Sequence, residues 1–285
     1  MFKHILIPIS SEYYSKELLK RSITLAETLH SKLHIVYIIE EKTLHKAEER
    51  VDSYRTSYER TTLKNVMVKE QMKAADTIVF NNVKEFLSNR EIIVEETILE
   101  GEFSEVITQE LQRKKYDLVL MGFDKQCLLN YRVFDHIDIP LWVVSKSGKK
   151  SILAICSNLA PNKKVPHISM QLSKVFNWDL RFLFIVDPQD SVEVDEHLQR
   201  SGKKTQEELL KNAQIFAQEM KHQGYNTEIV IGPLEKETAK AARQQGSTLI
   251  VVGREQKQHH LLDLTGKSIK RKIAENCDYS VLFIN

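Results

Sequence analysis

The sequence predicts two tandem α/β domains, each a five-stranded, mainly parallel, Rossmann-like sheet with helices on both faces. Three observations predict this fold class. The chain has 285 residues, the length of two average domains. Blocks of sequence recur in the same order in its two halves. In each half, strand-sized apolar runs alternate with segments of helical periodicity, a pattern typical of a parallel sheet covered by helices.

The repeat begins at the first expected strand of each half. Residues 3–11, KHILIPISS, align with residues 150–158, KSILAICSN, at an offset of 147 residues. At the same offset, residues 33–39, LHIVYII, align with residues 180–186, LRFLFIV. All four runs are continuous, apolar and of strand length, so they predict the first two buried strands of each sheet.

A second block recurs at an offset of 131 residues. Its strand ends are LEG at 99–101 and VIG at 230–232, and its next strands are YDLVLMG at 116–122 and STLIVVG at 247–253. The drop in offset means that the first half carries sixteen extra residues between the blocks. We expect them in the charged stretch 41–90, as helices over about residues 42–63 and 66–87.

A last apolar strand closes each half, PLWVV at residues 140–144 and SVLFI at 280–284. Helical segments with one apolar face precede or follow the strands at 18–29, 106–111, 209–220 and 269–274. The polar run KSGKK at 146–150 separates the halves. We therefore expect domains over residues 1–146 and 150–285, the first with a longer central helical segment.

Composition excludes several classes of partner. The chain has 41 Lys and Arg against 39 Asp and Glu, so we expect no nucleic-acid partner. Its apolar runs are far shorter than the ~18 residues of a membrane helix, so we expect no membrane span. The start of the chain lacks a signal-peptide pattern, which favours the cytoplasm. Cys127, Cys156 and Cys277 are widely spaced and predict no metal site.

The opening Ile-Leu-Ile-Pro strand at residues 5–8, followed by a turn rich in Ser and Glu, resembles the start of universal stress proteins. The Val-Val-Gly strand end at 251–253 and the short apolar strand after a closing helix are similar to that family too. The resemblance covers both halves and implies the adenine nucleotide alpha hydrolase-like fold. It also implies dimerisation, often through the last strand. Some members of the family hold ATP or AMP, and others hold none.

Nucleotide-binding members of the family carry an Asp at the end of the first strand, which addresses the adenine. Ser10 and Ser157 stand at the matching positions of the two halves. A serine can form hydrogen bonds but brings no charge. The resemblance therefore implies weakened adenine selectivity in both halves.

The family's phosphate loop has the form Gly-x2-Gly-x9-Gly-Ser/Thr after the fourth strand. Glycines allow close backbone approach, and the following helix N-terminus attracts phosphate oxygens. In the first half, Gly122 is followed by no further glycine before Pro140. We therefore expect no phosphate binding by the first half.

The second half keeps part of this loop. Gly253 and Gly266 stand at the first and third glycine positions, Gln256 replaces the second, and Lys267 precedes Ser268. The segment 266–268 could bind an anion through its amides and ammonium, or Ser268 could simply cap the following helix. The candidate nucleotide-binding residues are Ser157, Val186, Gly232, Gly253, Arg254, Gly266, Lys267 and Ser268.

These observations predict a non-enzymatic, cytoplasmic stress-response protein that acts through interaction or ligand sensing. Its domains are expected to pair as an internal pseudo-dimer through the strands at 141–144 and 281–284, which would otherwise expose apolar edges. Two alternatives stay open. One is an AMP or ATP sensor that uses the pocket of the second domain. The other is an ATP-hydrolysing enzyme, against which the sequence places no nucleophile with a base. Association of two chains into a homodimer is also open.

Overall fold

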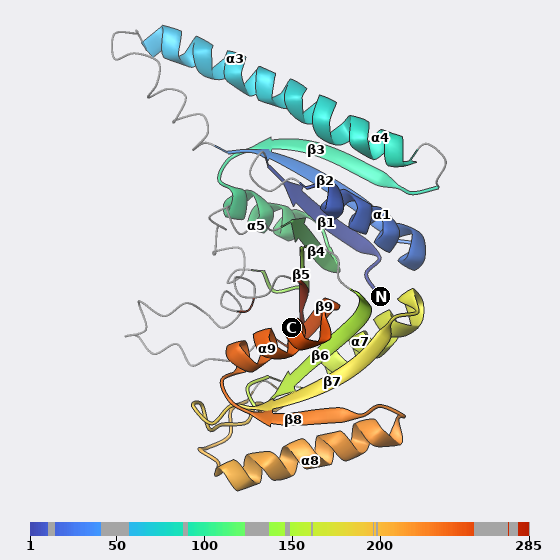
Figure 1. The fold of residues 1–285 in the computed structure, drawn as a ribbon. Helices are drawn as coiled ribbons and strands as arrows, with labels where there is room; N and C mark the ends of the chain where they lie inside the picture. Colours follow the sequence, from blue (N-terminus) through green and yellow to red (C-terminus); the bar gives the residue numbers. More distant parts are fainter. Residues whose placement is uncertain are drawn as a thin grey trace. The chain divides into compact units, whose positions relative to one another are not determined.

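The computed structural model describes residues 1–10, 15–40, 57–87, 91–122, 137–145, 149–160, 162–195, 197, 199–253, 273 and 279–284. The chain divides into two compact units, Met1–Ile137 and Asp138–Asn285. Each unit is a layer of mostly parallel strands with helices packed against it (Figure 1), as the sequence predicts. Among the described residues, no helix combines the length and apolar character needed to cross a bilayer.

Within the described part of the first unit, four parallel strands lie in the order β3-β2-β1-β4. Both inner strands are buried almost throughout, as expected for strands covered on two faces. The elements in chain order are β1 (His4–Ile9), α1 (Lys16–Leu29), β2 (Lys32–Ile39), α3 (Ser57–Ala75), the π-helical turn η1 (Asp76–Phe80), α4 (Asn81–Leu87), β3 (Val94–Glu100), α5 (Phe103–Arg113) and β4 (Leu118–Gly122).

Local sequence explains where α1 begins and ends. Ser15 is its N-cap, because its side chain accepts a hydrogen bond from the backbone N–H of Leu18 at 3.1 Å. His30 ends the helix in the left-handed conformation, with φ at 52°. Between these caps, Leu18, Leu19 and other apolar residues at helical spacing are buried, which confirms the predicted apolar face.

The central segment of the first unit is helical, but the predicted division into two helices is wrong. We expected a break near residues 64 and 65, whereas α3 runs through this point and continues through η1 into α4. Residues 57–87 contain no glycine or proline, so nothing in the local sequence interrupts the backbone hydrogen bonds. Residues 42–56 of the predicted helices lie outside the described residues.

The described residues of the second unit form six strands in the order β5-β10-β9-β6-β7-β8. All neighbours are parallel except β5 and β10. The elements are β5 (Leu141–Val144), β6 (Lys149–Ser157), α7 (Lys164–Phe176), β7 (Asp179–Val186), α8 (Gln206–His222), β8 (Thr227–Ile231), α9 (Leu234–Gln245), β9 (Ser247–Gly253) and β10 (Ser280–Ile284).

The helices of the second unit cover both faces of this sheet (Figure 1). The crossovers from β6 to β7 and from β7 to β8 move in the same direction, and right-handed crossovers then place α7 and α8 on one face. The connection from β8 back to β9 reverses direction, so α9 lies on the opposite face and contacts β6, β7 and β9.

The two closing strands pair with each other. Strand β5, which ends the first repeat in the sequence, runs antiparallel to β10, with Leu282 opposite Trp142 and Val281 opposite Val143. Trp142 is fully buried. The edge of β10 is therefore covered rather than exposed. The predicted domain limits, 1–146 and 150–285, follow the sequence repeat and stay a prediction.

Candidate functional site

Both repeats place the same three kinds of residue at the carboxyl ends of their first three strands. A serine ends the first strand, a carboxylate follows the second, and a glycine follows the third. Parallel α/β sheets bind ligands at this edge. The three residues are Ser10, Glu40 and Gly101 in the first repeat and Ser157, Asp187 and Gly232 in the second.

In the first unit, the serine and the carboxylate bind each other. Ser10 donates its hydroxyl to Oε1 of Glu40 at 2.9 Å, and both side chains are buried. The Gly101 N–H donates to the carbonyl of Ile39 at 3.1 Å. The serine that replaces the family's aspartate is thus paired with a carboxylate of the chain itself.

In the second unit, Ser157 is part of the turn that leads into α7. Its backbone N–H donates to Oδ1 of Asn162 at 3.1 Å, and its carbonyl accepts from Nδ2 of Asn162 at 3.0 Å. Its hydroxyl oxygen accepts a hydrogen bond from the N–H of Leu159 at 3.2 Å. Ser157 is only 2% exposed. These contacts tie the predicted adenine residue to the local turn.

Asp187 occupies the amino end of α9. Its Oδ2 accepts a hydrogen bond from the N–H of Leu234 at 2.9 Å, and its Oδ1 accepts from the N–H of Gln189 at 3.0 Å. Pro233, the N-cap of α9, makes no side-chain capping bond. A carboxylate at this position stabilises the positive end of the helix dipole. Asp187 therefore occupies the amino end of α9, where an anionic ligand could otherwise bind.

Asn158 is the centre of a buried hydrogen-bond network that the sequence did not reveal. Its Nδ2 donates to the carbonyls of Asp187, Asp190 and Val192 at 3.3, 3.1 and 2.8 Å. Its Oδ1 accepts from the N–H of Asp187 at 2.7 Å. One amide thus fixes the backbone of residues 187–192. The sequence offered one signal for this network: the two repeats differ at this position, where Asn158 aligns with Ser11.

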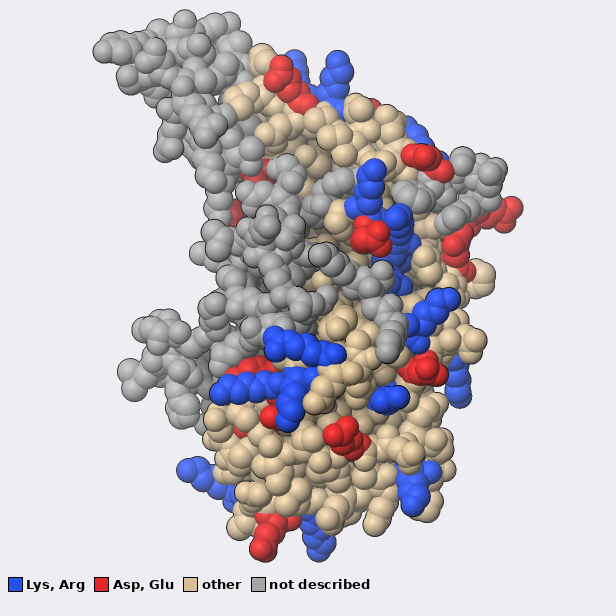
Figure 2. Space-filling view, in the orientation of Figure 1, with Lys and Arg blue, Asp and Glu red and all other residues tan. Residues whose placement is uncertain are grey.

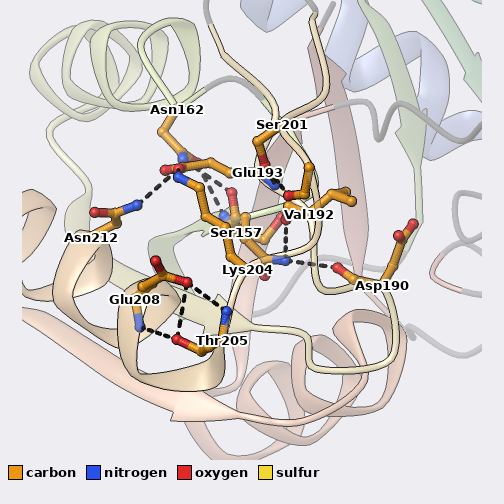
Figure 3. A network of polar contacts seen from close by, with 12 residues as sticks. Ser157, Asn162, Asp190, Val192, Glu193, Ser201, Lys204, Thr205, Glu208 and Asn212 are labelled. Carbon is orange, nitrogen blue, oxygen red and sulfur yellow. Dashed lines mark hydrogen bonds and ion pairs between the residues drawn. The ribbon is translucent and has the colours of Figure 1, made fainter.

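The remainder of the connection from β7 to α8 is held by side chains (Figure 3). Oε2 of Glu193 accepts from Nζ of Lys204 and, at 2.8 Å, from Nδ2 of Asn212. Thr205 and Glu208 then form a capping box at the start of α8. The backbone N–H of Thr205 donates to the Glu208 carboxylate and lowers its pKa. The described residues of this connection are therefore held by hydrogen bonds and ion pairs within the second unit.

Half of the predicted site residues can be placed. Ser157, Val186 and Gly253 end β6, β7 and β9, and Gly232 follows β8, so all four stand at the carboxyl edge of one sheet. Val186 is fully buried, and its carbonyl accepts from the N–H of Gly232 at 3.0 Å. Arg254, Gly266, Lys267 and Ser268 lie outside the described residues, as does the first-repeat loop after Gly122. Nucleotide binding by this set stays a prediction.

A second buried polar cluster lies in the first unit and was also missed. Nδ1 of His34 is 2.5 Å from the hydroxyl of Tyr116, which donates to Oε1 of Glu110 at 2.8 Å. Nε2 of His34 is 2.8 Å from Oγ1 of Thr97. His34 and Tyr116 line a cavity of about 380 Å³. Burial lowers the pKa of His34 and raises that of Tyr116.

The described residues offer little for metal or thiol chemistry. No group of three or more His, Cys, Asp or Glu side chains among them is arranged to hold a metal ion. Cys156 is a free, buried thiol, and burial raises its pKa, so the reactive thiolate is disfavoured.

Comparisons with known proteins agree with the fold. The family model described as "Universal stress protein family" matches residues 1–144 and 158–285. A putative universal stress protein from Pseudomonas aeruginosa UCBPP-PA14 is similar with a TM-score of 0.66 at 11% identity, covering 99% of this chain and 93% of that one. A universal stress protein from Archaeoglobus fulgidus DSM 4304 has the same TM-score at 12% identity, with 98% and 96% coverage. No curated protein sequence matches significantly.

Proposed function

Because this chain belongs to the universal stress protein family, in two tandem copies, we propose that it acts in the stress response without enzymatic activity, through a bound partner or ligand. Its two repeats would form an internal pseudo-dimer, the counterpart of the dimers of the family. Family membership also supports a cytoplasmic location. In this proposal the protein is a scaffold or sensor rather than a catalyst.

The observation that carries the proposal is the pairing of the closing strands. Val143 lies opposite Val281, and Leu141 opposite Phe283, in an antiparallel ladder that uses the last strand of each repeat. All four side chains are buried. The pairing of the two closing strands supports a pseudo-dimer, in which the two repeats of one chain replace the two subunits of a dimer of single domains.

Engineered disulfides test the pairing in the full chain. In a background without Cys127, Cys156 and Cys277, the double variant Val143→Cys with Val281→Cys is expected to form a disulfide on mild oxidation. The control pairs Val143→Cys with Ile284→Cys, which stands three residues, about 10 Å, further along β10. Non-reducing electrophoresis and mass spectrometry of peptides report the bond. Equal cross-linking in both variants would contradict the pairing.

A second candidate function, sensing of AMP or ATP by the second repeat, is supported by one observation. The strand ends at Ser157, Val186 and Gly253 share an edge of the sheet, and the partial phosphate loop with Gly266 follows in the sequence. Calorimetric titration with each nucleotide, with and without magnesium, tests it. Micromolar binding that Gly266→Val abolishes would support a sensor.

The same preparation tests whether the protein is an enzyme. Release of phosphate from ATP over hours at micromolar protein is expected to stay at the rate of the buffer. Turnover that increases in proportion to protein concentration, and that Gly266→Val removes, would overturn the non-enzymatic proposal.

A further inference from the structure

The second unit contains a cavity of about 870 Å³ that none of the described nucleotide-site residues lines. Its walls are the start of α7, the end of α8 and the loop from Glu193 to Lys204, and none of Ser157, Val186, Gly232 and Gly253 lines it. Sites for small organic molecules usually enclose roughly 300–1,000 Å³. The cavity is therefore of the right size for one such molecule.

One part of the cavity is apolar. Met170 comes from α7, Phe216 and Met220 come from α8, and Pro166 and Val194 complete this surface. The ring of Phe216 is tilted against Phe184, with centroids 5.3 Å apart. Thioether and aromatic side chains make favourable contacts with aromatic rings. This surface is suited to an aromatic group.

Another part of the cavity contains a guanidinium with unused hydrogen-bonding capacity. Nη2 of Arg200 donates to Oδ2 of Asp190 at 2.7 Å. Nε of Arg200 is buried and has no hydrogen-bond partner among the described residues. A buried donor without an acceptor is costly and rare in native proteins. Because Nε is closed off from the cavity, an acceptor in the cavity would bind at the terminal nitrogens of the guanidinium, which has five N–H groups in all and prefers an anionic acceptor.

Two acids of the loop that line the cavity, Glu193 and Asp195, already have hydrogen-bond partners. Glu193 binds Lys204 and Asn212, as Figure 3 shows, and Oδ1 of Asp195 accepts the backbone N–H groups of His197 and Gln199. The helix α7 begins beside the cavity without a side-chain cap, so its positive dipole end adds to the cationic character.

A further carboxylate of the lining stands apart. Glu219 lies about 20 Å along the axis of α8 from the start of that helix. Arg200 and Lys204 lie on the loop before α8, and each is paired with an acid of that loop, Arg200 with Asp190 and Lys204 with Glu193.

We propose that this cavity binds a small aromatic molecule with one anionic group, such as a carboxylate, sulfonate or phosphate. The ring packs between Met170 and Met220 over Phe216, and the anion binds Arg200. The network around Asn158 and Glu193 already holds described residues of the loop that contributes Arg200, which reduces the ordering cost when the ligand binds. This site is independent of nucleotide binding at the strand ends.

Fluorescence titration of the full chain with 8-anilinonaphthalene-1-sulfonate, an aromatic sulfonate, tests the apolar half of the site. We expect saturable binding of one molecule per chain. Met170→Glu is expected to weaken it at least tenfold, because a carboxylate would face the ring and the sulfonate. Val175→Glu is the matched control: it lies on the same helix, is 40% exposed and does not line the cavity. It should bind like the parent protein.

A second pair of variants tests the anionic half. Arg200→Gln removes both the guanidinium and its ion pair, and should weaken binding at least fivefold. Asp190→Asn weakens the same ion pair but keeps the guanidinium, so binding should be equal or tighter. Thermal melting by circular dichroism verifies that each variant is folded. The proposal is overturned if the parent shows no saturable site, if Val175→Glu loses as much affinity as Met170→Glu, or if Asp190→Asn loses as much as Arg200→Gln.

Discussion

Asn158 determines the course of the loop after β7. It is 2% exposed, and its single amide accepts one backbone hydrogen bond and shares its two protons among three carbonyls. No other side chain type offers donors and an acceptor at this length, because aspartate lacks the donors and leucine lacks both.

Asn158→Leu is therefore expected to destabilise the second unit by about 2–3 kcal/mol, because buried backbone groups lose their partners. Urea denaturation measures the change in the free energy of unfolding. Asn212→Leu is the comparison: it removes one amide bond, to Glu193, in the same network. If both variants lose the same stability, Asn158 does not have the central role that its four contacts indicate.

His34 is a buried titratable residue of the first unit. Burial is the largest cause of its lowered pKa, the nearby Glu95 and Glu110 oppose this effect, and Lys114 and Arg113 add to it. Its ordinary pKa is 6.5. As the pH falls through that value, the unfolded chain takes up the proton before the folded chain does. The free energy of unfolding therefore falls with falling pH.

We expect His34→Gln to reduce this dependence. Between about pH 7.5 and 5.5, the parent protein should lose more stability than the variant, because glutamine cannot take up a proton. Urea denaturation across this range gives the slope. His197→Gln, which removes an imidazole at an exposed position, is the matched control. A parent slope that His34→Gln does not alter would show that other groups cause it.

Among the elements, the turns from β3 to α5 and from β8 to α9 require glycine for the same reason. Gly101 has φ at 148° and Gly232 at 158°, and both N–H groups donate to the end of the neighbouring strand. A Cβ on Gly101 would lie 2.9 Å from Cγ2 of Val106, and one on Gly232 would lie 2.9 Å from Cγ of Glu237. The valine is short and branched, whereas the glutamate can move.

Gly101→Ala should therefore cost about 2–3 kcal/mol, and Gly232→Ala about 1–2 kcal/mol, from backbone strain and contact with the next helix. Gly202→Ala is the control, because nothing lies within 4 Å of its Cβ position and its φ is ordinary. Differential scanning calorimetry compares the three. A larger loss for Gly202→Ala than for Gly101→Ala would contradict the strain argument.

At the scale of the whole molecule, the sequence repeat and the compact units differ in one strand. Trp142 belongs to the first repeat in the sequence, yet its strand β5 lies in the second unit and pairs with β10. The indole is fully buried, and its Nε1 has no hydrogen-bond partner among the described residues. Removing this side chain should therefore affect the second unit.

Trp142→Ala is expected to cost about 3–5 kcal/mol through the cavity it leaves. Hydrogen exchange should rise in β9 and β10 and stay unchanged in β1 and β2. Leu18→Ala, which removes a fully buried side chain of α1, should give the reverse pattern. Faster exchange in β1 alone after Trp142→Ala would place β5 with the first unit.

Much of the fold could be predicted because its signals are local. The continuous apolar runs 180–186 and 247–253 form the buried strands β7 and β9, as expected for strands covered by helices on both faces. The repeat showed that the strands follow in the same sequence order in both halves. The break expected near residues 64 and 65 was wrong, because charge and spacing do not mark a helix end without glycine, proline or a cap. The candidate site was predictable only where it coincides with strand ends, such as Ser157 and Val186.

The sequence by itself determined the family and the repeat, and it showed serines at positions 10 and 157, where the resemblance implies an aspartate. Only the tertiary structure decided that β5 pairs with β10, that Asn158 holds the loop after β7, and that Arg200 lies in a cavity with Met170 and Met220. The physical reason is the range of the interactions. Strand and helix formation depend on near neighbours in the sequence, whereas strand pairing, buried hydrogen bonds and cavities join residues that only the folded chain brings together.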